Sequence, residues 1–186
     1  MKKRLILSAV SLVAVLGLTS CAKEVTAEEA NKQANSYTQD AASEKYTTGT
    51  LKVSTTVTSD NKKIQAILTL AGMESGKVYE TTVSTPVTVI TSATLTSFTS
   101  TYDSDHIKYY IDGSAVSVKI NYTGTNSDTS YGVTGTATIS AEFRTTGEGL
   151  ASYSHTKISY TDAKIGSTSI GSFSNEITST YTYSKD

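Results

Sequence analysis

The sequence predicts a mainly β domain of the α+β class, with one N-terminal helix packed on an antiparallel meander sheet. Three observations predict it. Threonine (33) and serine (27) make up about a third of the 186 residues, and threonine favours strands. A helical pattern begins near Thr26, and from Tyr46 onward apolar and polar residues alternate with a period of two. A β-sandwich is the alternative architecture, because short strands and Ser/Thr-rich loops suit it equally well.

The first 20 residues have the three zones of a secretory signal: a charged start, an apolar core and a short run of small or polar residues. Lys2 to Arg4 are all basic, and from Leu5 to Leu18 only two serines and one glycine interrupt the apolar stretch. As a helix, this core would be about 21 Å long, less than the ~30 Å of hydrocarbon in a bilayer. The pattern therefore indicates a signal peptide and not a membrane-spanning helix.

The end of this segment, Leu18-Thr19-Ser20-Cys21, resembles the lipobox of bacterial lipoproteins. The resemblance implies cleavage after Ser20 and a diacylglyceryl group on the Cys21 thiol, so that the chain is held on the extracytoplasmic face of a bacterial membrane. Two or more acyl chains anchor a protein stably, whereas one gives only marginal binding. The expected organisation is a signal peptide at 1–20, a lipidated anchor and short linker at 21–25, and a single domain at 26–186.

Charge and cysteine content narrow the expected partners and chemistry. Removal of residues 1–20 takes away three of 16 basic residues and none of 17 acidic ones, which leaves a net charge of −4. This balance argues against nucleic acid or an anionic surface as a partner. Cys21 is the sole cysteine of the sequence, so we expect no internal disulfide and no catalytic thiol.

The segment after the anchor has a helix-start signal. Thr26 can accept a hydrogen bond from the Glu29 amide while the Glu29 side chain reaches back, which is a capping box. Spacings of three and four then place small residues on one face of a helix expected at about 26–45. These residues are Ala27, Ala30, Ala34, Tyr37 and Ala41.

From residue 46 to 186 the alternation predicts eight or nine strands joined mostly by hairpins. Pro86 is expected to mark a strand break or a sheet edge, and Asp112-Gly113 suits a tight turn. Residues 123–131 are expected to form a polar loop and residues 162–172 a looser segment. The expected strands cover 46–58, 64–70, 77–84, 87–91, 107–111, 115–122, 133–143, 150–160 and a last strand through Ile177, Tyr181 and Tyr183.

The sequence does not predict an enzyme. His106 and His155 are the two histidines, they are far apart in sequence, and no G-x-S-x-G, H-E-x-x-H or P-loop motif occurs. We expect no metal site and no cofactor. The candidate ligand-binding residues are tyrosines, which could line a groove or simply cover the sheet. They are Tyr109, Tyr110, Tyr181 and Tyr183.

One helix followed by an antiparallel meander, behind a lipobox, is similar to the LolA/LppX-like group of lipoproteins. The resemblance rests on the order of the elements in residues 26–186. It implies that the sheet is curved into a half-barrel and holds a lipid or another small hydrophobic ligand on its concave face. The expected function is therefore non-catalytic ligand binding at the membrane, and the alternative is a surface-displayed structural or adhesive β-sandwich. The sequence leaves the ligand, the choice of membrane and the oligomeric state open.

Overall fold

A computed structural model describes residues 22–43, 48–86, 103–147 and 152–184. In these ranges it contains eight strands, two α-helices and a 3₁₀ turn, η1 (Ser104–His106). The helices are α1 (Ala27–Ser43) and α2 (Lys62–Leu70). The strands are β1 (Lys23–Val25), β2 (Thr48–Ser59), β3 (Val78–Pro86), β4 (Ile107–Asp112), β5 (Ala115–Asp128), β6 (Val133–Thr146), β7 (Ser152–Ile165) and β8 (Thr168–Ser184).

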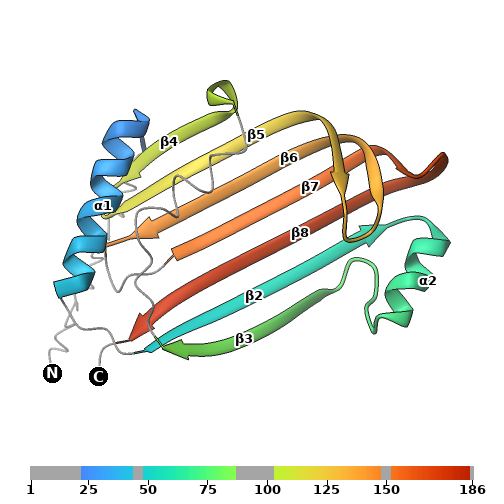
Figure 1. The fold of residues 1–186 in the computed structure, drawn as a ribbon, viewed down its shortest axis with the longest axis horizontal. Helices are drawn as coiled ribbons and strands as arrows, with labels where there is room; N and C mark the ends of the chain where they lie inside the picture. The colour runs from blue at the N-terminus through green and yellow to red at the C-terminus, as the bar shows by residue number, and fades with distance from the viewer. Residues whose placement is uncertain (1–21, 44–47, 87–102, 148–151, 185–186) are drawn as a thin grey trace, which may run out of the picture.

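All eight described strands belong to one open antiparallel sheet in the order β1-β4-β5-β6-β7-β8-β2-β3 (Figure 1). Strands β4 to β8 follow one another as hairpins, and β2 then pairs with β8. This confirms the predicted class, mainly β with an N-terminal helix on an antiparallel sheet. The sandwich alternative does not describe these strands, because a sandwich requires two sheets.

Helix α1 begins as the sequence predicts. The Thr26 amide donates to Glu29 Oε2 at 2.9 Å, and the Glu29 amide donates to Thr26 Oγ1 at 3.2 Å, which is the reciprocal pair of a capping box. Ala30, Ala34 and Tyr37 are buried against the sheet, whereas Ala27 is exposed in the first turn. The small-residue face lets the helix approach the strands closely.

The prediction of a strand at 64–70 was wrong, because these residues lie in α2. The Asn61 side chain accepts hydrogen bonds from the amides of Lys63 and Ile64 and caps the helix N-terminus. Ile64 and Leu68, four residues apart, are buried on one side. The apolar residues of this segment also alternate with a period of two, which suggested the strand: Ile64, Ala66, Leu68 and Leu70. The Asn61 cap stabilises the helix instead.

Three turns and loops also differ from the expected positions. The β4–β5 turn consists of Gly113 and Ser114, with Asp112 already paired to Ala115; Gly113 has a φ of 57°, which glycine adopts at little cost. The expected polar loop at 123–131 is strand as far as Asp128. The expected loose segment at 162–172 is mostly the β7–β8 hairpin. Thr123, Thr125 and Ser127 face solvent, so these strand ends lack an apolar signal.

The remaining strand expectations agree with the structure where it describes them. Strand β3 is one of the two edge strands of the sheet, and it ends at Pro86, as expected for an edge. The strand expected at 87–91 lies outside the described residues.

The sheet has one apolar and one polar face, because side chains alternate along each strand. The polar face carries threonine, serine and charged residues such as Lys119, Glu142 and His155. The apolar face holds two buried clusters. One is formed with α1 by Ala30, Ala34, Tyr37, Val116, Val118 and Phe143. The other is formed with α2 by Val57, Ile64, Leu68, Val133, Ala137, Ile139, Tyr160, Ala163, Ile170 and Phe173.

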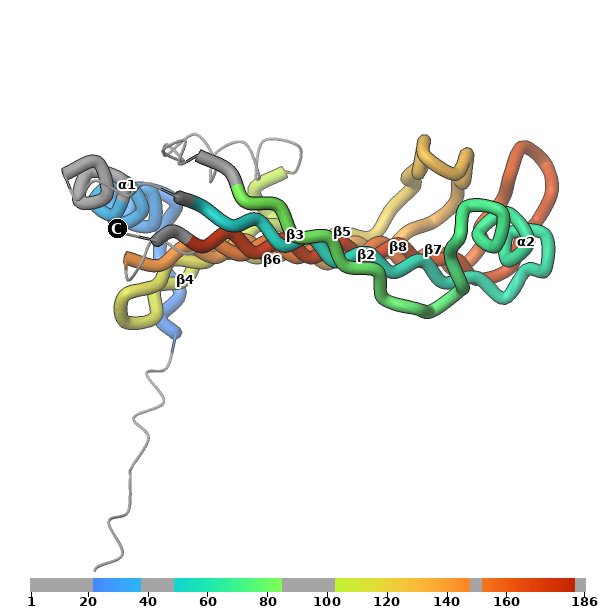
Figure 2. The backbone as a smooth tube through the Cα atoms, turned by 90° about the horizontal axis from the view of Figure 1, so that it is seen from below, coloured from blue at the N-terminus to red at the C-terminus, as the bar shows by residue number. Residues whose placement is uncertain are grey.

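The two clusters lie at opposite ends of the strands, which we call the α1 pole and the α2 pole (Figure 1). At the α2 pole the tip of the β5–β6 hairpin rises out of the sheet (Figure 2). The Asp128 carboxylate on this tip accepts a hydrogen bond from Asn175 Nδ2 on β8 at 3.1 Å, and the Tyr131 ring lies 5.5 Å from that of Phe173. The tip therefore folds over the apolar face and covers the second cluster.

A bulge in β6 accompanies this bend. The pairing of β6 with β7 shifts register between Thr134 and Ala137, and Gly135 has a φ of 154°. A Cβ at Gly135 would lie 2.9 Å from the Asp162 carbonyl oxygen, so the close approach of the two strands requires glycine. The Asp162 carboxylate accepts the hydrogen bond of the Thr136 amide at 2.6 Å, which satisfies a donor that the bulge leaves unpaired.

Candidate functional site

The predicted anchor residue, Cys21, lies outside the described residues. The description begins at Ala22, and Lys23 to Val25 form β1, which pairs with β4. The sequence assigned these residues to a linker at 21–25, and the structure places them in the sheet. The first strand of the sheet therefore begins two residues after Cys21, at the α1 pole.

The four candidate tyrosines do not form one groove. Tyr109 lies beside the α1 cluster, and Tyr110 points to the opposite face, where Lys119 Nζ lies 5.5 Å from its ring centroid. Tyr181 is on β8, and three strands separate β4 from β8. Tyr183 is in β8, and its side chain lies outside the description. That any of these tyrosines binds a ligand stays a prediction.

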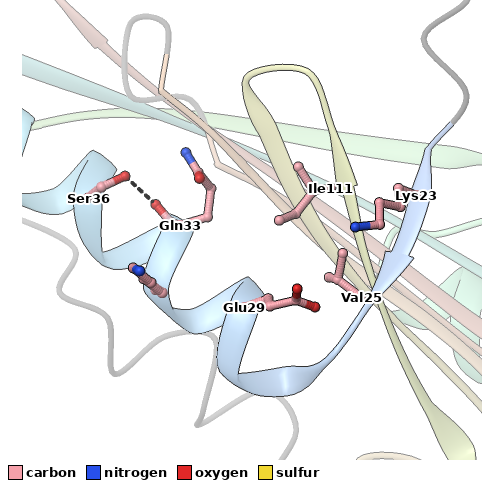
Figure 3. A pocket seen from close by; sticks show the side chains of 7 residues that line it. Lys23, Val25, Glu29, Gln33, Ser36 and Ile111 are labelled. Carbon is pink, nitrogen blue, oxygen red and sulfur yellow. Dashed lines mark hydrogen bonds between the residues drawn. The ribbon is translucent and has the colours of Figure 1, made fainter.

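A cleft of about 440 Å³ opens between α1 and the β1–β4 edge of the sheet (Figure 3). Its volume lies within the 300–1,000 Å³ typical of small-molecule sites. Glu29 and Gln33 extend from α1 toward Val25 and Ile111 on the adjoining strands. The cleft is lined by Lys23, Val25, Glu29, Lys32, Gln33, Ser36 and Ile111.

The helix cap and the strand pairing together shape this cleft. The capping box fixes the turn between β1 and α1 at Thr26, so that the helix runs back across the edge of the sheet. Pairing of Lys23 with Ile111 and of Val25 with Tyr109 sets the register of the opposite wall. Ser36 Oγ donates to the Gln33 carbonyl at 2.7 Å, which holds the serine hydroxyl against the helix.

The charged side chains of the lining differ in whether they already have partners. The Thr26 amide and hydroxyl donate to the Glu29 carboxylate and lower its pKa below the ordinary value, and attraction to Lys23 adds to this effect. Within the described ranges, no carboxylate lies within 4.0 Å of Lys23 Nζ or Lys32 Nζ. The lining therefore combines an aliphatic floor with two ammonium groups and one carboxylate that is engaged in the cap.

These groups suit binding by apolar contact, hydrogen bonds and ion pairs. Neither histidine takes part: His106 packs edge-on against the Tyr122 ring, with centroids 5.2 Å apart, and His155 lies on the polar face. The sequence could not reveal the cleft, because the wall facing α1 depends on the pairing of β1 with β4, which is distant in the chain. The sequence did indicate where the α1 wall begins, because the capping box gives the start of the helix.

Apart from the cleft, a cluster of charged side chains lies on the polar face of the sheet. His155 Nε2 is 2.8 Å from Glu176 Oε1, and Lys157 Nζ is 3.4 Å from Glu176 Oε2. The hydrogen bond with His155 lowers the pKa of Glu176 most, burial opposes the shift, and Lys157 lowers the pKa further. The three side chains belong to neighbouring strands, so the cluster ties β7 to β8.

Glu176 is expected to make the stability of the domain depend weakly on pH. Because the folded-state pKa is lowered, its contribution is fully present above the ordinary glutamate pKa of 4.5 and is lost as the pH falls through the lowered value. The side chain is 37% exposed, so water screens the pair and the contribution should be about 1 kcal/mol or less. Urea unfolding of the wild type and Glu176→Gln at several pH values measures it. A stability difference that grows on acidification would contradict the assignment.

The described part of the chain also bears on metal binding and on membrane crossing. There, no three His, Cys, Asp or Glu side chains group closely enough to hold a metal ion. None of the helices in these ranges has the length and hydropathy that crossing a membrane requires.

Comparison with protein-family models, with curated proteins and with solved structures finds no match to this chain.

Proposed function

We propose that this chain is an extracytoplasmic bacterial lipoprotein, held on the membrane by acylated Cys21, whose domain binds a small lipophilic ligand without changing it chemically. The observation that carries the proposal is the cleft between α1 and the β1–β4 edge, because Lys23 both follows the predicted anchor and lines the cleft.

The position of the cleft supports a ligand that comes from the membrane. Two residues of extended chain span at most about 7 Å, so acyl chains on Cys21 would hold the cleft close to the lipid headgroups. Val25 and Ile111 offer apolar contact to the body of such a ligand, and the lysines offer ion pairs or hydrogen bonds to a polar end. A molecule with an apolar body and a polar end fits this lining.

The lining also supports binding over catalysis. A hydrolytic or transfer reaction needs a nucleophile and a base in mutual contact. The described lining has one carboxylate, Glu29, which accepts hydrogen bonds from Thr26. Its hydroxyl group, on Ser36, donates to a backbone carbonyl. These groups hold the cleft in shape and leave the aliphatic and ammonium groups to contact a ligand.

Two mass spectra test the proposal. Under denaturing conditions, the protein isolated from bacterial membranes should start at Cys21 and carry a covalent lipid mass that Cys21→Ser lacks. Under native conditions, the chain from Ala22 to Asp186, purified without detergent, should carry an additional non-covalent small molecule. An unmodified Cys21 would reject the anchor, and a clean apo mass would reject the ligand, so the two parts can fail separately.

A matched pair of variants locates the ligand. Ile111→Glu replaces the apolar floor of the cleft with a carboxylate beside Lys23. It is expected to reduce the non-covalent adduct several-fold, because it removes apolar contact and pairs with an ammonium group that the polar end of the ligand would meet. Val83→Glu is the control, since Val83 lies on the same face and in the same cross-strand row, at the opposite edge of the sheet, and is 46% exposed. Far-UV circular dichroism checks that both variants fold. Equal loss of the adduct in both variants would place the ligand elsewhere.

A further inference from the structure

Helix α2 exposes large apolar side chains at the α2 pole. Leu70 is 91% exposed and Ile67 is 51% exposed, although Ile64 and Leu68 of the same helix are buried against the sheet. Lys63, Ile67 and Leu70 are spaced by four and three residues, so they share one side of the helix. We call Lys62, Lys63, Ile67, Leu70 and the exposed Ala71 the α2 tip.

The α2 tip is basic within an acidic protein. The helix carries two lysines and no Asp or Glu, whereas the whole chain has a net charge of −1. Within the described residues, no carboxylate lies within 4.0 Å of either ammonium group, and the nearby acidic side chains are engaged elsewhere. Asp60 accepts a hydrogen bond from the Ser172 amide, and Glu74 pairs with Lys77 at 3.6 Å.

We propose that the α2 tip docks into the interface of an anionic lipid bilayer, namely the bilayer that carries the Cys21 anchor. An interfacial helix combines an exposed apolar side with lysines that meet anionic headgroups, and the α2 tip has both. The contact takes from the proposed function only the anchor, and it does not depend on what the cleft binds.

The shape of the tip favours a bilayer over a protein partner. A stable protein interface buries roughly 800 Å² on each side and needs a complementary surface. The tip offers two large exposed aliphatic side chains, Ile67 and Leu70, which is too little for such an interface. A bilayer needs no matching shape, because lipids rearrange around an inserted side chain.

The placement of the tip also suits a contact on the anchoring membrane. Lys23, next to the predicted anchor, lies at the α1 pole, and α2 lies at the other end of the long axis (Figure 1). A domain attached at one end and touching the membrane at the other would lie along the surface. Since the anchor makes the second contact intramolecular, weak affinity of the α2 tip is sufficient.

A single introduced tryptophan tests this contact. The chain has no tryptophan, and Leu70 is almost fully exposed, so Leu70→Trp adds a unique fluorophore without disturbing the core. The variant is isolated from bacterial membranes with its Cys21 lipid attached and is reconstituted into vesicles of phosphatidylcholine and phosphatidylglycerol, with or without bromine on the acyl chains. We expect emission at shorter wavelength and several-fold quenching by the brominated lipid. Emission that is insensitive to the brominated lipid would overturn the proposal.

Three controls sharpen the result. Thr125→Trp places the probe on the polar face of the same pole and should escape quenching. Lys62→Glu with Lys63→Glu in the Leu70→Trp background should reduce the quenching several-fold; undiminished quenching would overturn the anionic requirement. Bromine supplied only in a second, protein-free vesicle population should have no effect. Quenching from that second population would assign the α2 tip to a facing membrane. A shift of the emission that needs no vesicles and grows with protein concentration would assign it to a second copy of the chain.

Discussion

Replacing Phe173 with alanine is expected to lower the free energy of unfolding by about 3–5 kcal/mol, the range for truncating a buried phenylalanine. Phe173 is 2% exposed on β8, and its ring lies 5.9 Å from that of Tyr160 and 5.5 Å from that of Tyr131. Tyr131 comes from the folded hairpin tip, so the substitution leaves a cavity between the sheet and its cover. Urea unfolding followed by far-UV circular dichroism measures the change.

Ile177→Ala is the matched control for Phe173→Ala. Ile177 lies on the same strand four residues further on and is 42% exposed, so its truncation removes less buried surface and should cost clearly less. A loss at Phe173 no larger than the loss at Ile177 would show that the hairpin tip does not close over the sheet as described. If the tip does close over the sheet, the losses of stability from Phe173→Ala and Tyr131→Ala should not add in the double variant, because the two rings are in contact.

The second large effect is expected from Ala30→Glu. Ala30 is fully buried, and its neighbours in the cluster are apolar residues such as Val116, Val118 and Phe143. A carboxylate there would be buried without a partner, which costs about 3–5 kcal/mol in comparable cases. Because the sheet keeps its second cluster at the α2 pole, the expected outcome is release of α1 from the sheet. The adduct expected for the proposed ligand site should be lost with it.

Limited proteolysis distinguishes release of α1 from general unfolding. Ala30→Glu should speed cleavage within α1 while the fragment containing β4 to β8 persists. Ala27→Glu is the control, since the same side chain on the exposed first turn lies at the favourable end of the helix dipole. Similar destabilisation by both substitutions would contradict the packing of α1 through its small-residue face.

The sequence predicted those parts of the fold that depend on short-range patterns. The capping box of Thr26 and Glu29 gave the start of α1 to within one residue, and alternation gave the strands of the β4–β7 region. The pattern failed at 64–70, where apolar residues fit a period of two as well as the i, i+4 spacing of Ile64 and Leu68. There the side chain of Asn61 caps the first turn, and the segment is a helix.

The cleft could not be predicted, because it depends on contacts between distant parts of the chain. The wall that faces α1 forms only when β1 pairs with β4, and the Glu24–Lys108 ion pair within this pairing joins residues 84 positions apart. Three residues are too short for an alternation pattern, so Lys23 to Val25 looked like a linker. The α2 tip was missed for a related reason, since exposure of Ile67 and Leu70 follows only once α2 is known to be a helix.

The order of the strands has a consequence for how this chain is made. Strand β2 pairs along its whole length with β8, so that Thr48 lies opposite Ser184. The β2–β3 hairpin can therefore join the rest of the sheet only after β8 has been synthesised. Until then the inner edge of β2 and the free edge of β7 both offer unpaired backbone groups to other chains. A chain with this order benefits from being kept unfolded until it is complete, and export ahead of folding would satisfy that requirement.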